Sequence, residues 1–326
     1  MNKSQPLVSI NLVVHNREPW LQRALDSIRA QTYQNIEINQ YDAIEGENIG
    51  FWAGQEKLLE RSKGAYIICI SDVVLDSDFV EKAVEIFEGD AKIGALQAKI
   101  LQNSNTSGRA VQAVERTIDT AGFEISKSRR ITNRRHGEID REQYHKGEIF
   151  AVEGAVPIFR REALEDAKID GHFIDPNFRI GPLGYGDDLD LAWRMRLLGW
   201  KQWYSPDVIA YHDRSTTRNI AHYWYDSLGI SRITKRKRIP IEKRRLDWLN
   251  VRFTIIKNDY IVNVLRDAPF IFFREVAVFF YTLIIEPSVF RMVPRFFRLL
   301  PKMIRQRKQI MHRARTSARE MKVWFR

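Results

Sequence analysis

The sequence predicts an α/β fold in which a mainly parallel, mixed sheet is covered by helices on both faces. Short apolar segments, typical of buried strands, alternate with segments whose apolar residues recur at helical spacing. Polar residues directly follow several of these apolar segments. The chain has 326 residues, of which 44% are hydrophobic, so it is long enough to bury a large core as one or two domains.

The individual elements follow from the same patterns. Strands are expected at residues 7–14, 35–41, 65–70, 93–101, 150–159, 201–204 and 208–211. Helices are expected near residues 20–28, 51–62 and 79–87, the last capped by Asp76 or Ser77. Residues 108–146 are polar and rich in arginine, which predicts a long loop over the site.

Three polar residues, Asn16, Asp42 and Asp72, lie at the ends of expected strands. Each one alone is typical of a turn. Because ligands of parallel sheets bind beyond the carboxyl ends of the strands, the three together favour a shared pocket.

Residues 184–200 are organised as a glycine-containing loop followed by a helix that should stop at Gly199. Asp187, Asp188 and Asp190 fall in the first turn of that helix, where the helix dipole favours negative charge. They are therefore either capping residues or carboxylates held at a loop–helix junction to take a proton from a hydroxyl group.

The distribution of charge and the cysteine content limit the possible functions and the cellular compartment of the protein. The net charge is +11, but residues 291–326 hold 12 Lys/Arg and one acid, so the rest of the chain is neutral. This distribution argues against nucleic-acid binding. The single cysteine, Cys69, excludes an intramolecular disulfide and fits a reducing compartment. The N-terminus leads into a short apolar segment that predicts a strand and not a signal peptide.

The composition changes from residue 221, which predicts domains at 1–220 and 221–326. Residues 269–285 are very apolar but contain Arg274 and Glu275, so this segment is expected as an interfacial helix, with a membrane-spanning helix or packing on the body as alternatives. Beyond it, arginines and lysines alternate with apolar residues at helical spacing, typical of a basic amphipathic region that binds an anionic membrane surface. Pro294 and Pro301 predict short, kinked helices here.

The order of several motifs over nearly the whole chain resembles family 2 glycosyltransferases of the GT-A fold, and most closely the bacterial rhamnosyltransferase branch. The motifs are Val13-Val-His-Asn-Arg17, Gln31–Glu37 with Asp42, Asn48–Gly54, Ser71–Phe79, Asp119–Gly122, His136–Asp140, Glu153–Ala155 with Arg160 and Arg161, Gly186–Arg194, Tyr211-His212, Lys257–Asp259 and Leu300-Pro-Lys302. Two positions depart from the pattern: Ile70 stands where a polar residue is usual, and Glu153 where a small hydroxyl residue is usual.

The resemblance implies roles for individual residues. It implies Asp188 as the general base with Asp187 as its partner, and leaves Asp190 as a helix cap. Asp72 and His212 would bind a divalent cation, Mg²⁺ or Mn²⁺. The nucleotide-sugar would contact Asn16, Arg17, Asp42, Asn48, Gly50 and Asp72. The acceptor side would include Glu153, Gly154 and Trp193, although a tryptophan at helical spacing is also typical of a core.

The activity implied by the resemblance is inverting transfer of a sugar, with rhamnose from dTDP-rhamnose as the best candidate and a UDP-sugar as the other. The acceptor would be a lipid-linked or cell-surface glycan at the cytoplasmic face of the bacterial inner membrane, where the protein would be peripheral or monotopic. Assembly into a homo-oligomer stays open. The alternative is a membrane-associated glycan-binding or scaffold protein with a degenerate site, which Ile70 would favour.

Overall fold

The computed structural model describes residues 5–15, 20–102, 116–212, 236–237 and 239–326. Its sheet runs in the order β2-β1-β3-β10-β5-β13-β4. The strands on this path are β1 (Val8–Val14), β2 (Ile36–Asp42), β3 (Tyr66–Ile70), β4 (Val73–Leu75), β5 (Ile93–Gln102), β10 (Pro157–Arg160) and β13 (Lys201–His212). β10 is antiparallel to both of its neighbours and β4 to β13, whereas the remaining pairs are parallel. The largely parallel mixed sheet expected from the sequence is thus confirmed.

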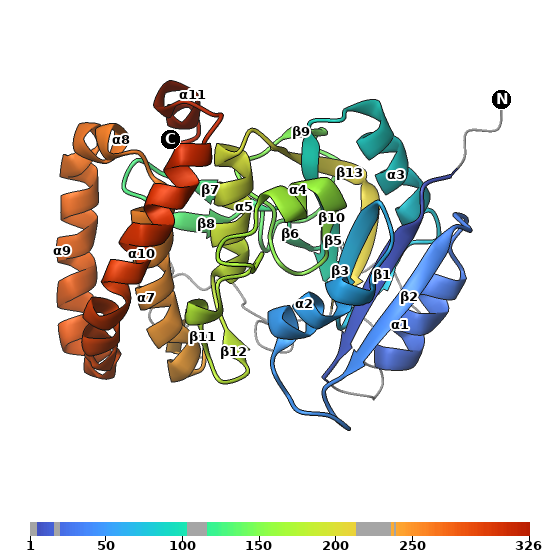
Figure 1. Cartoon of the computed structure of the whole chain (residues 1–326), viewed down its shortest axis with the longest axis horizontal. Helices are drawn as coiled ribbons and strands as arrows, with labels where there is room; N and C mark the ends of the chain where they lie inside the picture. Colours follow the sequence, from blue (N-terminus) through green and yellow to red (C-terminus); the bar gives the residue numbers. More distant parts are fainter. Residues whose placement is uncertain (1–4, 16–19, 103–115, 213–235, 238) are drawn as a thin grey trace.

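Helices cover both faces of this sheet (Figure 1). One face packs against α1 (Trp20–Arg29) and α3 (Phe79–Gly89), which contribute to a core that contains most of β1, β3 and β4. The other face packs against α2 (Phe51–Arg61), α4 (Arg161–Asp166) and α5 (Asp187–Leu197). The periodicity in α3 explains its position, because Phe79, Val80, Ala83, Val84 and Phe87 are all buried on one face.

Several expected elements differ in detail. The two strands predicted at 201–204 and 208–211 are one strand, β13, with a register irregularity between Ser205 and Ile209. The strand predicted at 150–159 is limited to Pro157–Arg160. Asp78, rather than Asp76 or Ser77, is the N-cap residue of α3, and its side chain makes no capping hydrogen bond.

The described part of the expected long loop contains short strands. They are β6 (Ile118–Thr120), β7 (Phe123–Ile125) and β8 (Ile131–Asn133), followed by β9 (Gly147–Glu148). β6 pairs with β5 and β9 with β13, so the loop is attached to two strands of the main sheet. A further hairpin, β11 (Arg179–Ile180) and β12 (Leu183–Gly184), leads into α5 after the 3-10 helix η1 (Pro176–Phe178).

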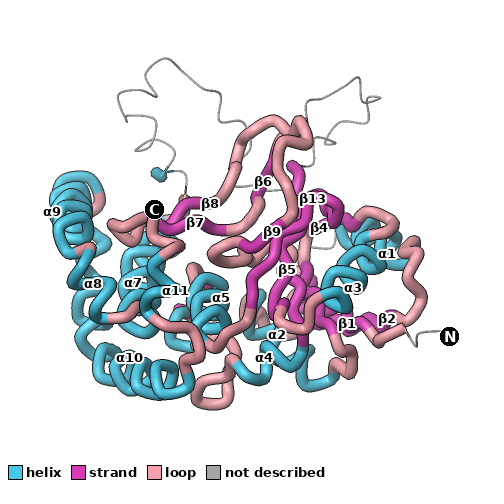
Figure 2. Tube along the Cα trace, turned by 90° about the horizontal axis from the view of Figure 1, so that it is seen from above, coloured by secondary structure: helices cyan, strands magenta, loops and turns pink. Residues whose placement is uncertain are grey.

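The C-terminal residues form helices that stand on one side of the sheet (Figures 1 and 2). They are α7 (Ile241–Asn258), α8 (Ile261–Arg266), α9 (Ala268–Ile285), η3 (Pro287–Met292), α10 (Val293–Arg313) and α11 (Ala318–Lys322). The predicted boundary between residues 220 and 221 lies outside the described residues. The end of the chain returns to the body, where Phe325 packs against Trp193 with 5.9 Å between the ring centroids.

α10 differs from the short, kinked helices that the prolines predicted. It is one helix of 21 residues, with Pro294 in its first turn and Pro301 inside it. Pro294 is tolerated because the first amides of a helix have no partner within the helix. Pro301 is exposed, and α10 packs along α7 and buries Met303, Gln306 and Ile310, so tertiary contacts hold the helix together.

Candidate active site

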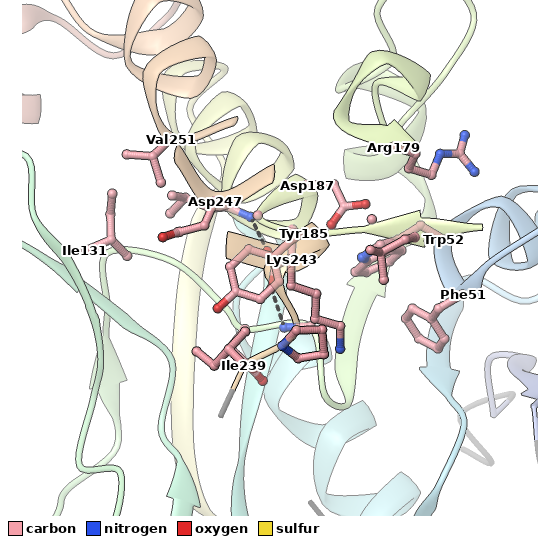
Figure 3. A pocket seen from close by; sticks show the side chains of 18 of the residues that line it. Phe51, Trp52, Ile131, Arg179, Tyr185, Asp187, Ile239, Lys243, Asp247 and Val251 are labelled. Atoms are coloured by element: carbon pink, nitrogen blue, oxygen red, sulfur yellow. Dashed lines mark hydrogen bonds between the residues drawn. The ribbon is translucent and has the colours of Figure 1, made fainter. Parts of the chain in front are cut away.

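A cavity of about 1280 Å³ lies beyond the carboxyl ends of the central strands. It is bounded by the ends of β1, β3 and β13, by the loop before α5, and by α7 and α9 on the far side (Figure 3). Of the residues expected at a site, it is lined by Asn48, Gly50, Asp72, Glu153, Gly154, Asp187, Asp188 and His212. Of the three strand-end residues that predicted a shared pocket, Asp72 lines this cavity, Asp42 does not, and Asn16 lies outside the described residues.

Four of the expected residues are not among the described residues that line the cavity. Asn16 and Arg17 lie outside the described residues. Asp42 closes a turn at the end of β2, where its Oδ1 accepts the amides of Ile44 and Glu45 at 2.8 and 3.1 Å. The structure places Trp193 in the core and not at the acceptor side, because it is 0% exposed and packs edge-on against Phe150 at 5.3 Å.

Asp188 is positioned by two backbone amides. Its Oδ2 accepts the amide of Gly154 at 2.9 Å, and its Oδ1 accepts the amide of Leu189 at 2.8 Å. A Cβ atom at residue 154 would lie 2.9 Å from Asp188 Oδ2, so only glycine permits this approach. Burial raises the pKa of Asp188 to about 8, and the charges of Glu153 and Asp187 add to this effect.

Asp187 lies beside Asp188 and is almost fully buried. Within the described part of the chain its Oδ2 has no hydrogen-bond partner. Burial is the main reason why its pKa is raised to about 7. Two adjacent carboxyl groups that both resist ionisation are typical of sites that exchange protons near neutral pH, and both face the same cavity.

Asp190 corrects the expectation of a helix cap. Its side chain is 1% exposed and makes no capping hydrogen bond; the N-cap position is Gly186. Its Oδ2 lies 2.8 Å from Lys257 Nζ, and its Oδ1 accepts a hydrogen bond of 2.7 Å from the Asn258 side chain. Asp190 also pairs with Arg194. It therefore fastens the first turn of α5 to α7.

α7 also fixes the loop before α5. Asn250 is fully buried and its side-chain amide donates to the carbonyl groups of Phe178 and Tyr185, both at 2.7 Å. Lys257 Nζ makes a second ion pair, at 2.9 Å, with Asp175. Since Tyr185 and Asp190 flank Asp187 and Asp188, the position of the two carboxyl groups depends on α7.

Asp72 and His212 meet at the opposite wall of the cavity. Asp72 Oδ1 lies 3.4 Å from His212 Nε2, and His212 Nδ1 lies 2.9 Å from Asp119 Oδ2. Burial alone would lower the pKa of His212, but hydrogen bonds to Asp119 and Asp72 raise it to about 9. Burial would likewise raise the pKa of Asp72, and the hydrogen bond and charge of His212 hold it below its ordinary value.

This arrangement fits a divalent cation. Asp119 holds Nδ1 and directs Nε2 towards Asp72, the usual arrangement around a metal-binding histidine. Asp72 and His212 would supply an oxygen and a nitrogen ligand. Among the described residues no group of three or more His, Cys, Asp or Glu side chains is placed to hold a metal ion, so further ligands would come from the phosphates of a substrate.

The turn between β2 and α2 packs closely against the hairpin formed by β11 and β12. Gly50 has φ +86°, and a Cβ atom there would lie 1.9 Å from the carbonyl oxygen of Pro182. The Asn48 side chain accepts the Gly50 amide at 3.1 Å and closes this turn. The expected motif at residues 48–54 thus brings the β2–α2 turn against the β11–β12 hairpin, at the mouth of the cavity.

The comparison with known families decides the assignment. The family described as "Glycosyltransferase like family 2" matches residues 50–224, more than half of the chain. The chain belongs to this family. Family membership and the largely parallel sheet confirm the GT-A fold and indicate glycosyl transfer as the activity. No curated protein matches the chain.

Several solved structures are similar to the chain. "GalNAc-T7 with UDP, GalNAc and Mn2+" is 15% identical, with a TM-score of 0.49, and the alignment covers 65% of this chain and 45% of that one. The mannosyltransferase PcManGT from Pyrobaculum calidifontis, in complex with GDP-Man and Mn²⁺, is 13% identical, with coverages of 98% and 88% and a TM-score of 0.45. TarS residues 1–349 from S. aureus are 12% identical, with coverages of 90% and 91% and a TM-score of 0.46. The chain thus spans less than half of the first of these.

Sequence reasoning missed part of this site. Asp119 lies within a motif of the expected loop, yet its contact with His212 joins residues 93 positions apart and leaves no local pattern. His15, at the end of β1, lines the cavity, and burial lowers its pKa. The wall formed by α7 and α9 was also not foreseen, because neither helix has a motif that indicates a cavity.

Proposed function

We propose that this glycosyltransferase moves a sugar from a nucleoside diphosphate to a hydroxyl group of its acceptor with inversion at C1. The observation that carries the proposal is the placement of Asp188 in one cavity with Asp72 and His212. One wall offers a proton acceptor and the other offers groups suited to a cation and a diphosphate. A single displacement at C1 needs both.

In this mechanism Asp188 accepts the proton of the acceptor hydroxyl as its oxygen attacks C1 and the nucleoside diphosphate departs. A base is most effective when its pKa lies near the working pH, which the raised pKa of about 8 allows. A divalent cation between Asp72 and His212 would neutralise charge on the departing diphosphate. Asp119 orients the His212 ring.

The sugar is the least constrained part of the proposal. Rhamnose from dTDP-rhamnose is favoured by the resemblance to the rhamnosyltransferase branch. The test is a panel of dTDP-, UDP- and GDP-sugars, each measured for binding and hydrolysis with Mn²⁺, with Mg²⁺ and with EDTA. Turnover of dTDP-rhamnose above all others supports the assignment. Binding of no nucleotide-sugar under any condition would favour the alternative of a degenerate glycan-binding protein.

Ile70, which stands where the family usually has a polar residue, gives little support to the alternative of a degenerate site. Ile70 is the last residue of β3 and is 0% exposed. It packs in the core with β1 and α3 residues and is absent from the cavity lining. An apolar residue at this position therefore removes no ligand from the site beside Asp72.

Glu153 gives a prediction on pH dependence. As a base, Asp188 acts only when deprotonated, so the transfer rate is expected to reach half of its maximum near pH 8 and to level off about one pH unit above that. Replacing Glu153 by glutamine removes a negative charge that raises this pKa. The pH of half-maximal rate is then expected to fall by about half a unit or more. The measurement is the pH profile of kcat at saturating donor and acceptor.

The matched control is Glu60→Gln, which removes the same charge from an exposed position on α2. Its profile should coincide with that of the wild type. An unchanged profile for Glu153→Gln would show that Glu153 does not influence the base.

We also propose that the protein is monotopic at the cytoplasmic face of the bacterial inner membrane, with a lipid-linked glycan as acceptor. α9 is long and apolar enough to cross a membrane, and only Thr282 among its residues is buried. Arg274 and Glu275 interrupt it, and Glu275 pairs with Arg252 of α7, so one face of α9 is attached to the body. Placement in the membrane interface satisfies both observations.

The exposed face of α9 gives the corresponding prediction. Phe273 and Ile284 are 71% and 72% exposed. Introducing glutamate at both positions is expected to reduce binding to phosphatidylglycerol vesicles at least tenfold, because each apolar side chain that enters the interface contributes on the order of 1–2 kcal/mol. The binding is measured by flotation of the protein with phosphatidylglycerol vesicles. Ile38→Glu, on edge strand β2 at the opposite end of the molecule in Figure 1, is the control and should float as the wild type does.

A further inference from the structure

The cavity has a second end that the transfer reaction does not use. It is formed by α7, α9 and the start of β8 and is lined by Arg130, Lys243, Arg252, Arg274, Val278 and Tyr281. Figure 3 shows Lys243 in the cavity beside Tyr185, on the side of α7. The same space therefore connects the carboxyl groups of α5 with a basic wall.

The cations of this wall differ in their partners. Arg252 and Arg274 share Glu275, and Arg236 pairs with Asp247 and Glu286. Lys243 is half-buried, and within the described part of the chain no acidic side chain pairs with it. A partly desolvated ammonium group without a counter-ion is a strong site for a phosphate oxygen.

α9 links this wall to the lipid-facing surface. Arg274, Val278, Tyr281 and Thr282 line the cavity, and their spacing of four, three and one places them on one side of the helix. The opposite side carries exposed residues such as Phe280, at 54%, and Leu283, at 50%. One helix thus separates the cavity from the surface that we place in the membrane.

We infer that this end of the cavity binds the phosphate or diphosphate group of a lipid-anchored acceptor, with Lys243 as its principal ligand. Arg252 and Arg274 add positive charge from the same wall, and Arg130 adds positive charge from the residue just before β8. The lipid chain leaves the cavity beside α9 and enters the bilayer. The acceptor sugar is then held between the lipid phosphate and Asp188. This inference rests on the proposed function and specifies how its acceptor is recognised.

The test uses the full-length protein and four kinds of phosphatidylcholine vesicle. One is plain, one contains a long-chain polyprenyl diphosphate, one contains the same polyprenol without phosphate, and one contains phosphatidylglycerol at equal surface charge. The wild type is expected to bind diphosphate vesicles more tightly than phosphatidylglycerol vesicles. Lys243→Ala is expected to weaken binding to diphosphate vesicles about tenfold and to leave binding to phosphatidylglycerol vesicles unchanged.

Two controls make the result specific. Arg298→Ala removes an exposed cation of α10 outside the cavity, so it should weaken binding to both anionic vesicles alike. Lys243→Arg keeps the charge and should retain at least part of the preference. The inference would be overturned if the Lys243→Ala protein still bound diphosphate vesicles in preference to phosphatidylglycerol vesicles. It would also be overturned if this substitution weakened binding to both kinds of anionic vesicle equally. If free pyrophosphate competed for this site as strongly as the polyprenyl diphosphate does, the lipid chain would have no role in binding.

The proposed function is measured separately, as nucleotide-sugar binding by the wild type without vesicles. If a donor binds and Lys243→Ala leaves the vesicle preference intact, the acceptor site is refuted and the function stands. If no donor binds while the vesicle preference depends on Lys243, the function is refuted and the lipid-phosphate site stands.

Discussion

Asp188→Asn is expected to lower sugar transfer by about 10²–10⁴-fold while nucleotide-sugar binding changes little. Asparagine has the same shape, and its carbonyl oxygen can still accept an amide hydrogen bond of the kind made by Gly154 or Leu189. It cannot take a proton from the acceptor hydroxyl. The measurement is the transfer rate at saturating substrates, together with donor affinity by calorimetry.

Asp187→Asn is the matched control, because it changes the neighbouring carboxyl group and leaves the proposed base in place. It should reduce the rate far less than Asp188→Asn. Removing the Asp187 charge should also lower the pKa of Asp188, so its pH profile should move to lower pH. Near-normal turnover by Asp188→Asn would remove Asp188 as the base.

The second large effect is expected from Lys257→Met. Lys257 is fully buried, and its ammonium group lies 2.9 Å from Asp175 and 2.8 Å from Asp190. Removing one partner of a buried ion pair leaves charge without compensation, so the free energy of unfolding should fall by about 3–5 kcal/mol. Thermal unfolding, followed by circular dichroism, should show a midpoint several degrees below that of the wild type.

Lys308→Met is the control, since Lys308 is exposed on α10. Its unfolding free energy should stay within about 0.5 kcal/mol of the wild type. If the two variants unfold at the same temperature, the contacts of Lys257 do not stabilise the fold. A Lys257→Met protein that stays folded should also have lower kcat, because Asn258 is then the one described contact that still joins Asp190 to α7 and the first turn of α5 is held less firmly.

Much of the sheet could be predicted because its information is local. A buried strand leaves a short, mostly apolar run and an amphipathic helix leaves a periodicity of apolar residues, each within about ten residues, as in β5 and α3. Asp72 and Asp188 each have a local signal, the end of a strand and the start of a helix, but their roles at a site were predicted from the resemblance of the motifs to family 2 glycosyltransferases. The family match at residues 50–224 confirms the fold and supports the proposed glycosyl transfer.

The errors arose where distant residues decide the structure. Asp190 has the local features of a cap, but its partners Lys257 and Asn258 lie 67 and 68 residues further along the chain. Pro301 predicts a break, yet packing of α10 on α7 keeps one helix. The strand pattern at 201–211 has a polar gap that looks like a loop, but β5 pairs with the residues on both sides of it.

The two halves of α7 have different consequences for engineering. The first half lines the cavity through Lys243, Asp247 and Trp248, whereas the second half holds α5 through Asn250 and Lys257. A fragment that ends at residue 220 would lack α7, and with it the contacts of Asn250 and Lys257 that hold α5 and the loop before it. If α7 binds the acceptor as we propose, a chimera that exchanges the exposed and cavity-lining residues of 241–249 and keeps 250–258 should alter acceptor recognition and leave the contacts that hold α5 in place. Acceptor preference could thus be redesigned within a single helix.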